Sequence, residues 1–316
     1  MAASGALFSW WTVGFPLAGA AALAASLIGL QVPIGAVVVL LIGCTFSSVH
    51  HAETLAHRLG ALFGSLVLAL AISVIDAGLI VSMMLGGDQP ELARDSIFSA
   101  LLIALNGILG VCLLLGGGRH YEQNFRVSAS NAFLAVLVPL SMLTMVLPSY
   151  TMSAPGPVFT RAQLIFVAAV SFVLYMLFLY VQLVRHRSDF ITDHEVVPDA
   201  PRPTARDALI ALAPLVLLPE GITAIKAARQ NRLQTALNLT LGSVLACVVL
   251  AIPAVAITAL ITNQSLHLGL NEPMVVLLFT TFLTLSFTLN TGRSTVLEGF
   301  VHLAIFATFI LFTMLP

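Results

Sequence analysis

The sequence predicts an all-α polytopic membrane protein with about ten hydrophobic segments. Hydrophobic residues make up 59% of the 316 residues and charged residues only 9%, which is too little charge to cover a soluble domain. The mean hydropathy is +1.03. The apolar residues also fall into runs of about 17 to 25, the length that a helix needs to cross a bilayer. The net charge of −1 excludes the basic surface that a nucleic-acid partner requires.

Six apolar runs precede the only long polar stretch of the chain. Trp10 and Trp11 open the first run as an interfacial aromatic pair, and no basic region precedes them, so we expect a leading transmembrane helix rather than a cleaved signal. The second run continues into the polar segment HHAETLAHR, and the third ends at the acidic turn GGDQPELARD. The fourth ends in the glycine run that starts at Gly116, the fifth in a proline-rich loop and the sixth at Arg185. These runs cover about 8–30, 33–50, 62–86, 96–116, 129–148 and 162–184.

Residues 185–206 are rich in Asp, Arg and Pro, which predicts a solvated linker. A short run at about 207–225 follows and is broken by Pro214 and Pro219. Three clear apolar runs complete the chain, at about 235–262, 273–291 and 298–316.

Basic residues gather in alternate loops and predict the orientation. The turns at 30–33 and 263–272 carry no Arg or Lys, and the loop at 87–95 is net acidic. By the positive-inside rule the basic loops are cytoplasmic, which places the linker and the N-terminus inside. The basic positions are Arg58, Arg119, Arg126, residues 185–206, residues 226–232 and Arg293.

Each half of the chain has one acid within an apolar run. Asp76 interrupts the third run, with Ser73 one helical turn before it on the same face. Glu220 lies in the proline-broken run. A carboxylate in the middle of a membrane helix costs about 2.5 to 3.5 kcal/mol on insertion scales, so by default it lines a polar cavity or an ion path. The two acids therefore predict an ion site.

Several longer blocks carry a family resemblance. They are, in chain order, HAETLAHRLG, GGGRHYEQNF, LLPEG with RLQTALNLTLGSVLA, and GRSTVLEG. With these blocks the chain resembles the calcium/proton exchangers of the calcium/cation antiporter superfamily, in the bacterial branch that moves calcium, or sodium and potassium, against protons. The resemblance implies a protein of the bacterial cytoplasmic (inner) membrane. It also implies two inverted repeats, each giving one acid to a cation site at mid-membrane, with alternating access around that site.

On this resemblance the chain has a leading helix at 1–30, a first repeat at 31–184, the linker at 185–206 and a shortened second repeat at 207–316. Relatives have eleven helices, and the helix that should open the second repeat is missing. We expect residues 207–225 to enter from the cytoplasmic side and return, or to lie buried as a half-helix. Lys226 to Arg232 would then stay cytoplasmic and the C-terminus would be outside.

The resemblance places the two ion-binding acids on Asp76 and Glu220, which would be the metal ligands, and helper side chains on Asn106 and Ser243. With Ser73, these residues form the expected cation and proton site.

The sequence departs from the family pattern at several of these positions. The first acid is Asp76, where relatives usually have glutamate. Ser73 and Leu217 stand where many exchangers have an asparagine before each acid, and Ala246 stands where the broader family has a glutamine. The expected site therefore has fewer polar side chains than its relatives.

The chemistry of the residues agrees with an ion site. Calcium takes six to eight oxygen ligands, and two carboxylates supply both neutralising charge and up to four oxygens. Pro219 and Pro214 lack an N–H, so the carbonyls of Leu215 and Ile210 lose their usual helical donors and become available to a cation. The same acids, desolvated and without an ion, favour their protonated form. Ion and proton then compete for one site, which is the minimal mechanism of an exchanger.

Each of these residues also has a structural interpretation. Asp76 could be a buried acid that only hydrogen-bonds Ser73 or Asn106, and Glu220 could pair with Lys226 or Arg229.

The histidine-rich segment HHAETLAH does not have the spacing of a zinc motif, so we expect a vestibule or proton-relay role, or a plain helix end. The residues concerned are His51, Glu53 and His57. Glu298 is a further vestibule candidate, although an acid at a helix start is favoured by the helix dipole in any case.

The sequence leaves several functions open. A calcium/proton antiporter is the first, a sodium (or potassium)/proton antiporter the second, and a transport-inactive membrane subunit the third. An intramembrane metalloenzyme would rest on the histidine segment alone, and we do not expect an enzyme. We expect no resident cofactor. The partners would be small inorganic cations, protons and membrane lipid, with a homo-oligomer left open.

Overall fold

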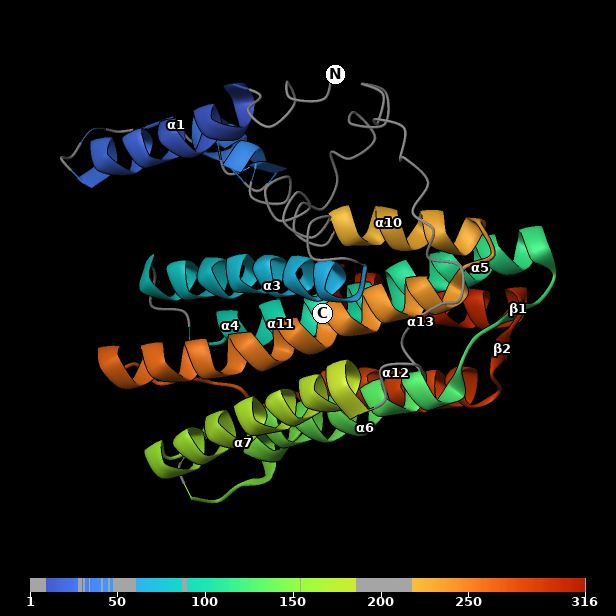
Figure 1. Cartoon of the computed structure of the whole chain (residues 1–316). Helices are drawn as coiled ribbons and strands as arrows, with labels where there is room; N and C mark the ends of the chain where they lie inside the picture. The colour runs from blue at the N-terminus through green and yellow to red at the C-terminus, as the bar shows by residue number, and fades with distance from the viewer. Residues whose placement is uncertain are drawn as a thin grey trace. The chain divides into compact units, whose positions relative to one another are not determined.

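The structure, a computed structural model, describes residues 10–27, 30, 32–33, 35–40, 42–44, 46–47, 61–86, 90–153, 155–185 and 218–315. The chain divides into two compact units, Met1–Ile75 and Asp76–Pro316. Helix α3 (Ala61–Gly86) starts in the first unit and ends in the second. Nearly all the described residues are helical (Figure 1), which confirms the predicted all-α fold class.

The first unit contains α1 (Trp10–Leu27) and short helical stretches within 35–47. The Cys44 thiol donates a hydrogen bond to the carbonyl of Phe15 at 3.2 Å. The Ser47 hydroxyl donates to the carbonyl of Thr12. These two bonds hold the second apolar run of the sequence against the first.

The second unit is a bundle of helices, and three of its described helical stretches contain a π-helical turn next to a longer α-helix. Six stretches of described helix are long and apolar enough to cross a membrane, which confirms a multi-pass protein. The elements are α4 (Leu92–Leu102), η1 (Ile103–Ile108), α5 (Leu109–His120), α6 (Val127–Ser141), η2 (Met142–Val146), η3 (Leu147–Tyr150), α7 (Arg161–Tyr180), η4 (Val181–Arg185), α10 (Leu218–Arg229), α11 (Leu233–Thr262), α12 (Glu272–Asn290) and α13 (Val296–Met314).

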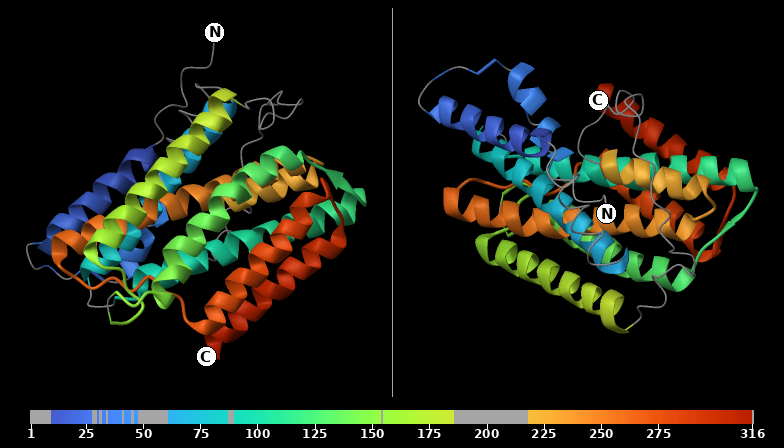
Figure 2. Two further views of the ribbon diagram at one scale, coloured as in Figure 1. Left: turned by 90° about the horizontal axis from the view of Figure 1, so that it is seen from below. Right: turned by 45° about the horizontal axis from the view of Figure 1, so that its top comes forward.

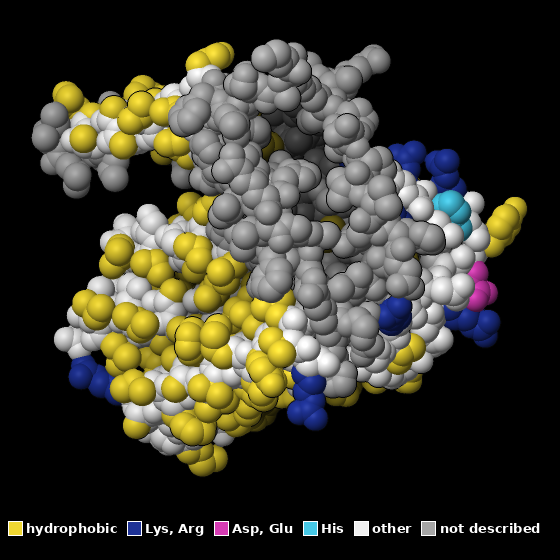
Figure 3. All heavy atoms as spheres, viewed as in Figure 1, with side chains coloured by type: hydrophobic (Ala, Val, Ile, Leu, Met, Phe, Trp, Pro, Cys, Tyr) yellow, Lys and Arg dark blue, Asp and Glu magenta, His cyan; other side chains and the backbone are white. Residues whose placement is uncertain are grey.

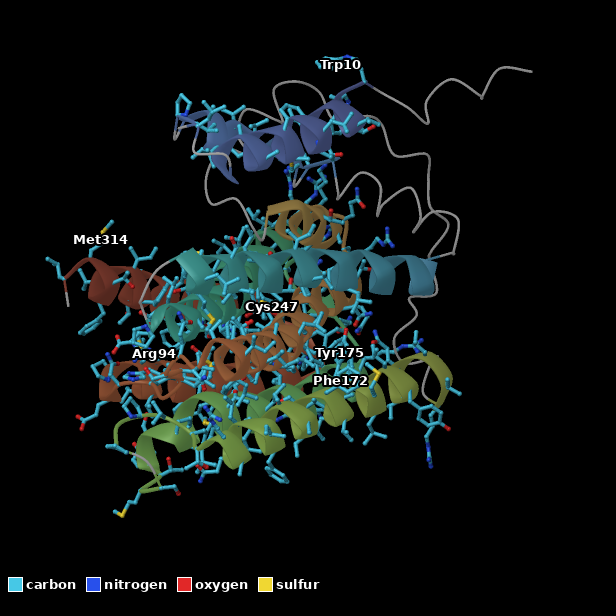
Figure 4. The ribbon with its side chains drawn as sticks, turned by 90° about the vertical axis from the view of Figure 1, so that its left-hand side faces the viewer. Trp10, Arg94, Phe172, Tyr175, Cys247 and Met314 are labelled. Atoms are coloured by element: carbon cyan, nitrogen blue, oxygen red, sulfur yellow. The ribbon has the colours of Figure 1, made fainter. Side chains whose placement is uncertain are left out.

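Helix α11 forms the core of the second unit. It contacts α4, η1, α5, α6, α7 and α10, and most of its side chains are buried. Figure 4 shows Cys247, near the middle of α11, surrounded by side chains of the other helices. Helices α12 and α13 lie side by side in both views of Figure 2, and α13 packs on α5 and η1. The first and second halves of the sequence are thus interleaved around α11.

Local signals set several helix ends. Thr160 and Gln163 form a capping box at the start of α7, and Thr295 and Glu298 form another at the start of α13. Helix α11 ends at Asn263, which adopts the left-handed conformation with φ +57°. Such signals explain why most predicted boundaries lie within a few residues of the observed ones.

The glycine run at Gly116 to Gly118 does not end a helix, contrary to our expectation. Helix α5 continues through it to His120. A Cβ added to Gly117 would lie 2.7 Å from the backbone nitrogen of Val296, so the glycine permits close packing on the start of α13. A side chain added to Gly118 would meet nothing within 4 Å.

One end of the second unit collects the basic loops, and we call it the basic end. Strands β1 (Gln123–Asn124) and β2 (Arg293–Ser294) pair there, and the Gln123 amide donates to the carbonyl of Ala228 at 2.8 Å. His120 Nε2 lies 3.0 Å from the carbonyl oxygen of Arg229. Figure 3 shows Lys and Arg side chains gathered at this end, with apolar side chains covering the flank of the bundle. The basic residues are Arg119, Arg126, Lys226, Arg229, Arg232 and Arg293.

The opposite end holds the loops that the sequence predicts to be on the outer side. Arg94 is buried there, pairs with Glu91 and Asp95 at 2.8 Å each, and donates to the carbonyl of Gly269 at 3.3 Å. Figure 4 labels Arg94 at this end. The unequal distribution of charge between the two ends agrees with the loops that we grouped from sequence.

Helix α10 is the described part of the proline-broken run, and residues 207–217 lie outside the described residues. The 12 residues of α10 span about 18 Å. A three-residue connection joins it to α11, against which it packs. The structure holds Lys226 to Arg232 at the basic end, next to Arg119 and Arg126. The course of 207–225, as a re-entrant segment or a buried half-helix, stays a prediction.

Candidate cation site

Asp76 is the only charged residue in the 26 residues of α3. It is buried, with 6% of its surface exposed. Among the residues that the structure describes, its carboxylate has neither a hydrogen bond nor an ion pair. A buried carboxylate without a partner is costly, so it is expected to bind a cation or a proton.

Ser73 lies one turn before Asp76 on α3 and is completely buried. Its hydroxyl has no hydrogen-bond partner among the described residues. The described residues therefore do not support the structural interpretation in which Asp76 only hydrogen-bonds Ser73 or Asn106.

Ser243, on α11, has the same property. It is 3% exposed, and its hydroxyl has no hydrogen-bond partner in the part of the chain that the structure describes. Thr240 lies one turn earlier on the same helix, is equally buried and likewise has no partner there. Ser141, on α6, is the remaining helical hydroxyl of this kind among the described residues.

These unpartnered hydroxyls depart from the usual behaviour of helical Ser and Thr, which donate to the carbonyl four residues earlier. Two other completely buried hydroxyls do this: Thr144 donates to Leu140 at 2.8 Å and Ser171 donates to Val167 at 2.7 Å. Burial alone therefore does not leave a hydroxyl without a partner here. Hydroxyls that do not bond to their own helix are available to a ligand.

Asn106 lies in the π-helical turn η1 and is completely buried. Its amide nitrogen donates to the Thr281 hydroxyl of α12 at 2.8 Å. Its amide oxygen lies 3.0 Å from His302 Nδ1 of α13. Single π-helical turns inside longer helices are frequent at functional sites. Asn106 is thus held by two helices that follow it by more than 170 residues.

Glu220 is the third residue of α10, and its side chain lies outside the described residues. The next residue, Gly221, is buried against η1, since a Cβ added to it would lie 3.0 Å from Cδ1 of Ile108. Ile108 is two residues from Asn106. The start of α10 therefore lies against the turn that carries Asn106. The predicted ion pair of Glu220 with Lys226 or Arg229 is not tested.

The vestibule candidates are described only in part. His51, Glu53 and His57 lie outside the described residues. The Glu298 carboxylate accepts hydrogen bonds from the backbone nitrogen of Thr295 at 2.9 Å and from its hydroxyl at 2.5 Å. These bonds explain Glu298 as a capping residue, and its vestibule role stays a prediction. The described residues contain no group of three or more His, Cys, Asp or Glu that could hold a metal ion.

Sequence reasoning missed His302, Thr281, Thr288 and Thr240. His302 offered a signal, because it is a single histidine within the otherwise apolar stretch of α13. The threonines offered none, because threonine is common in membrane helices and the sequence does not show which helices meet.

These observations define a helical membrane protein whose described bundle buries several polar side chains. Residues 32–184 and 207–315 match the family described as sodium/calcium exchanger protein, and the chain belongs to this family. Its members are exchangers rather than enzymes.

Three named proteins are similar to the chain in sequence. It is 41% identical to the ionic transporter y4hA of Sinorhizobium fredii, over 88% of this chain and 87% of that protein. It is 32% identical to the sodium-potassium/proton antiporter ChaA of Escherichia coli, over 86% of each. It is 24% identical to a vacuolar calcium ion transporter of Schizosaccharomyces pombe, over 84% of this chain and 72% of that protein.

Two solved structures share the fold. The structure of YfkE matches with a TM-score of 0.61 at 16% identity, over 94% of this chain and 97% of that one. The crystal structure of the H⁺/Ca²⁺ exchanger CAX matches with a TM-score of 0.62 at 16% identity, over 95% of this chain and 87% of that one. These matches support the predicted fold across nearly the whole chain.

Proposed function

We propose that this protein is a cation/proton antiporter in which Asp76 and Glu220 form one site that binds either a cation or protons. The observation that carries the proposal is Asp76 itself: a buried carboxylate in an apolar helix, without a partner among the described residues. The unpartnered hydroxyls of Ser73 and Ser243 add support, because both were predicted as site residues.

Exchange follows from competition at this site. With a cation bound, its charge compensates the carboxylates, and the hydroxyl and amide oxygens can complete its coordination. Without a cation, the desolvated carboxylates take up protons. A site that holds neither cation nor protons has two uncompensated carboxylates and is unfavourable. The cation therefore leaves the site only as protons replace it. Alternating access then turns competition into antiport.

Calcium is our first choice of cation, because two carboxylates balance its charge and its ligands are all oxygens. Sodium or potassium is the alternative. It gains support from the 32% identity to a relative named as a sodium-potassium/proton antiporter. Two carboxylates can also balance two monovalent ions, so charge does not decide between the two.

Everted membrane vesicles test the proposal. A proton gradient is formed by respiration, and CaCl₂, NaCl or KCl is then added at several pH values. An antiporter collapses the gradient when its cation is added, and vesicles without the protein provide the background. A protein that collapses the gradient with none of the three salts would instead be a transport-inactive subunit, the third function that the sequence leaves open.

We also propose that the basic end faces the cytoplasm of a bacterial inner membrane, with the N-terminus inside. The gathering of six Lys and Arg residues there supports this orientation. A single cysteine at Arg232, in a background without Cys44, Cys112 and Cys247, should react with an impermeant thiol reagent only from the cytoplasmic side. Reaction from outside would show that 207–225 crosses the membrane as a plain span.

A further inference from the structure

The strongest polar cluster that the proposed mechanism leaves unused is a chain of four buried side chains. It runs from Thr281 on α12 through Asn106 on η1 to His302 on α13, and back to Thr288 on α12. His302 and Asn106 are completely buried, Thr281 likewise, and Thr288 is 3% exposed. It is a continuous hydrogen-bonded chain inside an otherwise apolar bundle.

The donors and acceptors of this chain can be assigned in one direction. The Thr281 hydroxyl donates to the carbonyl of Leu277 at 2.8 Å, so its oxygen accepts from the Asn106 amide nitrogen. The Asn106 oxygen then faces His302, whose Nδ1 must carry the hydrogen and donate at 3.0 Å. The Thr288 hydroxyl lies 3.2 Å from Nε2 and donates to it. When the His302 imidazole is neutral, each of the four side chains has a hydrogen-bond partner.

In this arrangement the Asn106 amide makes only half of the hydrogen bonds that it can form. An amide oxygen accepts two hydrogen bonds and an amide nitrogen donates two, and the chain occupies one of each. One acceptor position on the oxygen remains for a cation. Its direction is fixed because both ends of the amide are held from α12 and α13.

We infer that His302 is a positioning residue: its Nδ1–H orients the amide oxygen of Asn106 toward the cation. The inference rests on the proposed function, in which Asn106 is a cation ligand. Without the Nδ1–H donor, the amide is held only through Thr281 and can rotate, so the oxygen is presented to the cation for part of the time. A ligand that must be ordered on binding lowers affinity.

The packing around His302 supports this role over plain space filling. Gly110, on the next turn of the same helix as Asn106, lies so close that a Cβ there would be 3.2 Å from Cβ of His302. A Cβ on Gly107 would lie 3.3 Å from the Phe306 ring, one turn further along α13. Two glycines beside Asn106 thus let α13 approach closely enough for His302 to reach the amide.

Matched variants distinguish a positioning role of His302 from a purely structural one. His302→Asn keeps a donor near the place of Nδ1 but cannot titrate. His302→Gln places its amide near Nε2, within reach of Thr288 and away from Asn106. His302→Leu removes both. Thr308→Val is the control on α13, since the Thr308 hydroxyl is exposed and bonds only to its own helix, at the carbonyl of Ala304.

The experiment measures the cation concentration that gives half-maximal exchange in everted vesicles, with CaCl₂, NaCl and KCl. In parallel, it measures the rise in thermal unfolding temperature of the purified protein with the same salts. We expect His302→Leu and His302→Gln to raise the half-maximal concentration about three- to tenfold, the equivalent of one hydrogen bond. We expect His302→Asn and Thr308→Val to remain within about twofold of the unchanged protein, because the first keeps a donor to Asn106 and the second removes a hydroxyl that bonds to its own helix.

Equal losses in His302→Asn and His302→Gln, or no loss in His302→Leu, would overturn the positioning role while the unchanged protein still exchanges ions. A variant that loses activity by misfolding is recognised by a lowered unfolding temperature in the absence of salt. If the unchanged protein neither exchanges nor is stabilised by any of the salts, the proposed function itself fails, and the positioning role with it.

Discussion

The hydroxyl groups in the two halves of α11 differ in their hydrogen bonding. In the first half, Thr240 and Ser243 are buried and have no hydrogen-bond partner. In the second half, Thr258 donates to the carbonyl of Ala254 and Thr262 to that of Thr258, each at 2.8 Å. The second pair needs nothing beyond its own helix. The first pair leaves its donors and acceptors available to another group.

In the proposed function, hydroxyls without a partner in their own helix contribute to the cation site, whereas Thr258 and Thr262 have only a structural role. This difference also indicates how far the candidate site extends along α11. Thr240 was not predicted, yet it shares burial, helical face and lack of a partner with the predicted Ser243. Variants on both halves of α11, and at Asp76 and Glu220, test this distinction.

The largest effect on cation exchange is expected from replacing Asp76 or Glu220. Asp76→Asn and Glu220→Gln should each abolish cation-dependent exchange, because a neutral amide neither compensates a cation nor exchanges a proton. Membrane insertion should be unchanged or easier, since an intramembrane charge is removed. Exchange in everted vesicles and the amount of protein in the membrane provide the two readouts. Glu272→Gln, an exposed acid at the start of α12, is the control and should be fully active. Full exchange in either site variant would exclude that acid from the site.

A smaller effect is expected in the first half of α11. Ser243→Ala and Thr240→Val each remove one oxygen and should raise the half-maximal cation concentration about three- to tenfold, the range of one hydrogen bond or ligand contact. Thr258→Val, in the second half of the same helix, should change it by less than about twofold, because the hydroxyl bonds only to its own helix. If all three variants behave alike, the two halves of α11 do not differ in function.

The smallest change is expected from Asp76→Glu. The longer side chain restores the residue that the family usually has and reaches further toward a shared ion. The preference for calcium over sodium and potassium should therefore rise, with the carboxylate charge unchanged. Initial exchange rates with the three cations measure the ratio. An unchanged ratio would show that side-chain length at this position does not set selectivity.

The sequence predicted the helices well, because the length of an apolar run and its flanking charges are local properties. It misplaced the end of the fourth run at Gly116, since glycine can either end a helix or allow another helix to approach, and only the contact of Gly117 with Val296 decides between the two. The polar positions Asp76, Ser73, Asn106 and Ser243 were predicted from their place in apolar runs and from family resemblance.

The partners of these residues could not be predicted. Asn106 meets Thr281 and His302 across 175 and 196 residues of chain, and hydropathy does not show which faces of two apolar helices will meet. Thr240 could not be distinguished from Thr258 either, because their different bonding depends on packing around α11. The sequence thus predicted a site, and the structure adds the hydrogen-bond partners of Asn106.

Competition between cation and proton for one site is tested by proton release on cation binding. The purified protein is placed in weakly buffered solution with a pH indicator dye, and CaCl₂, NaCl or KCl is added. We expect the cation that binds to displace protons from the carboxylates, and Asp76→Asn to release fewer protons. We also expect the half-maximal cation concentration to rise as pH falls, because protons then occupy the site. Tight cation binding without proton release, and with an affinity that does not change with pH, would contradict this competition.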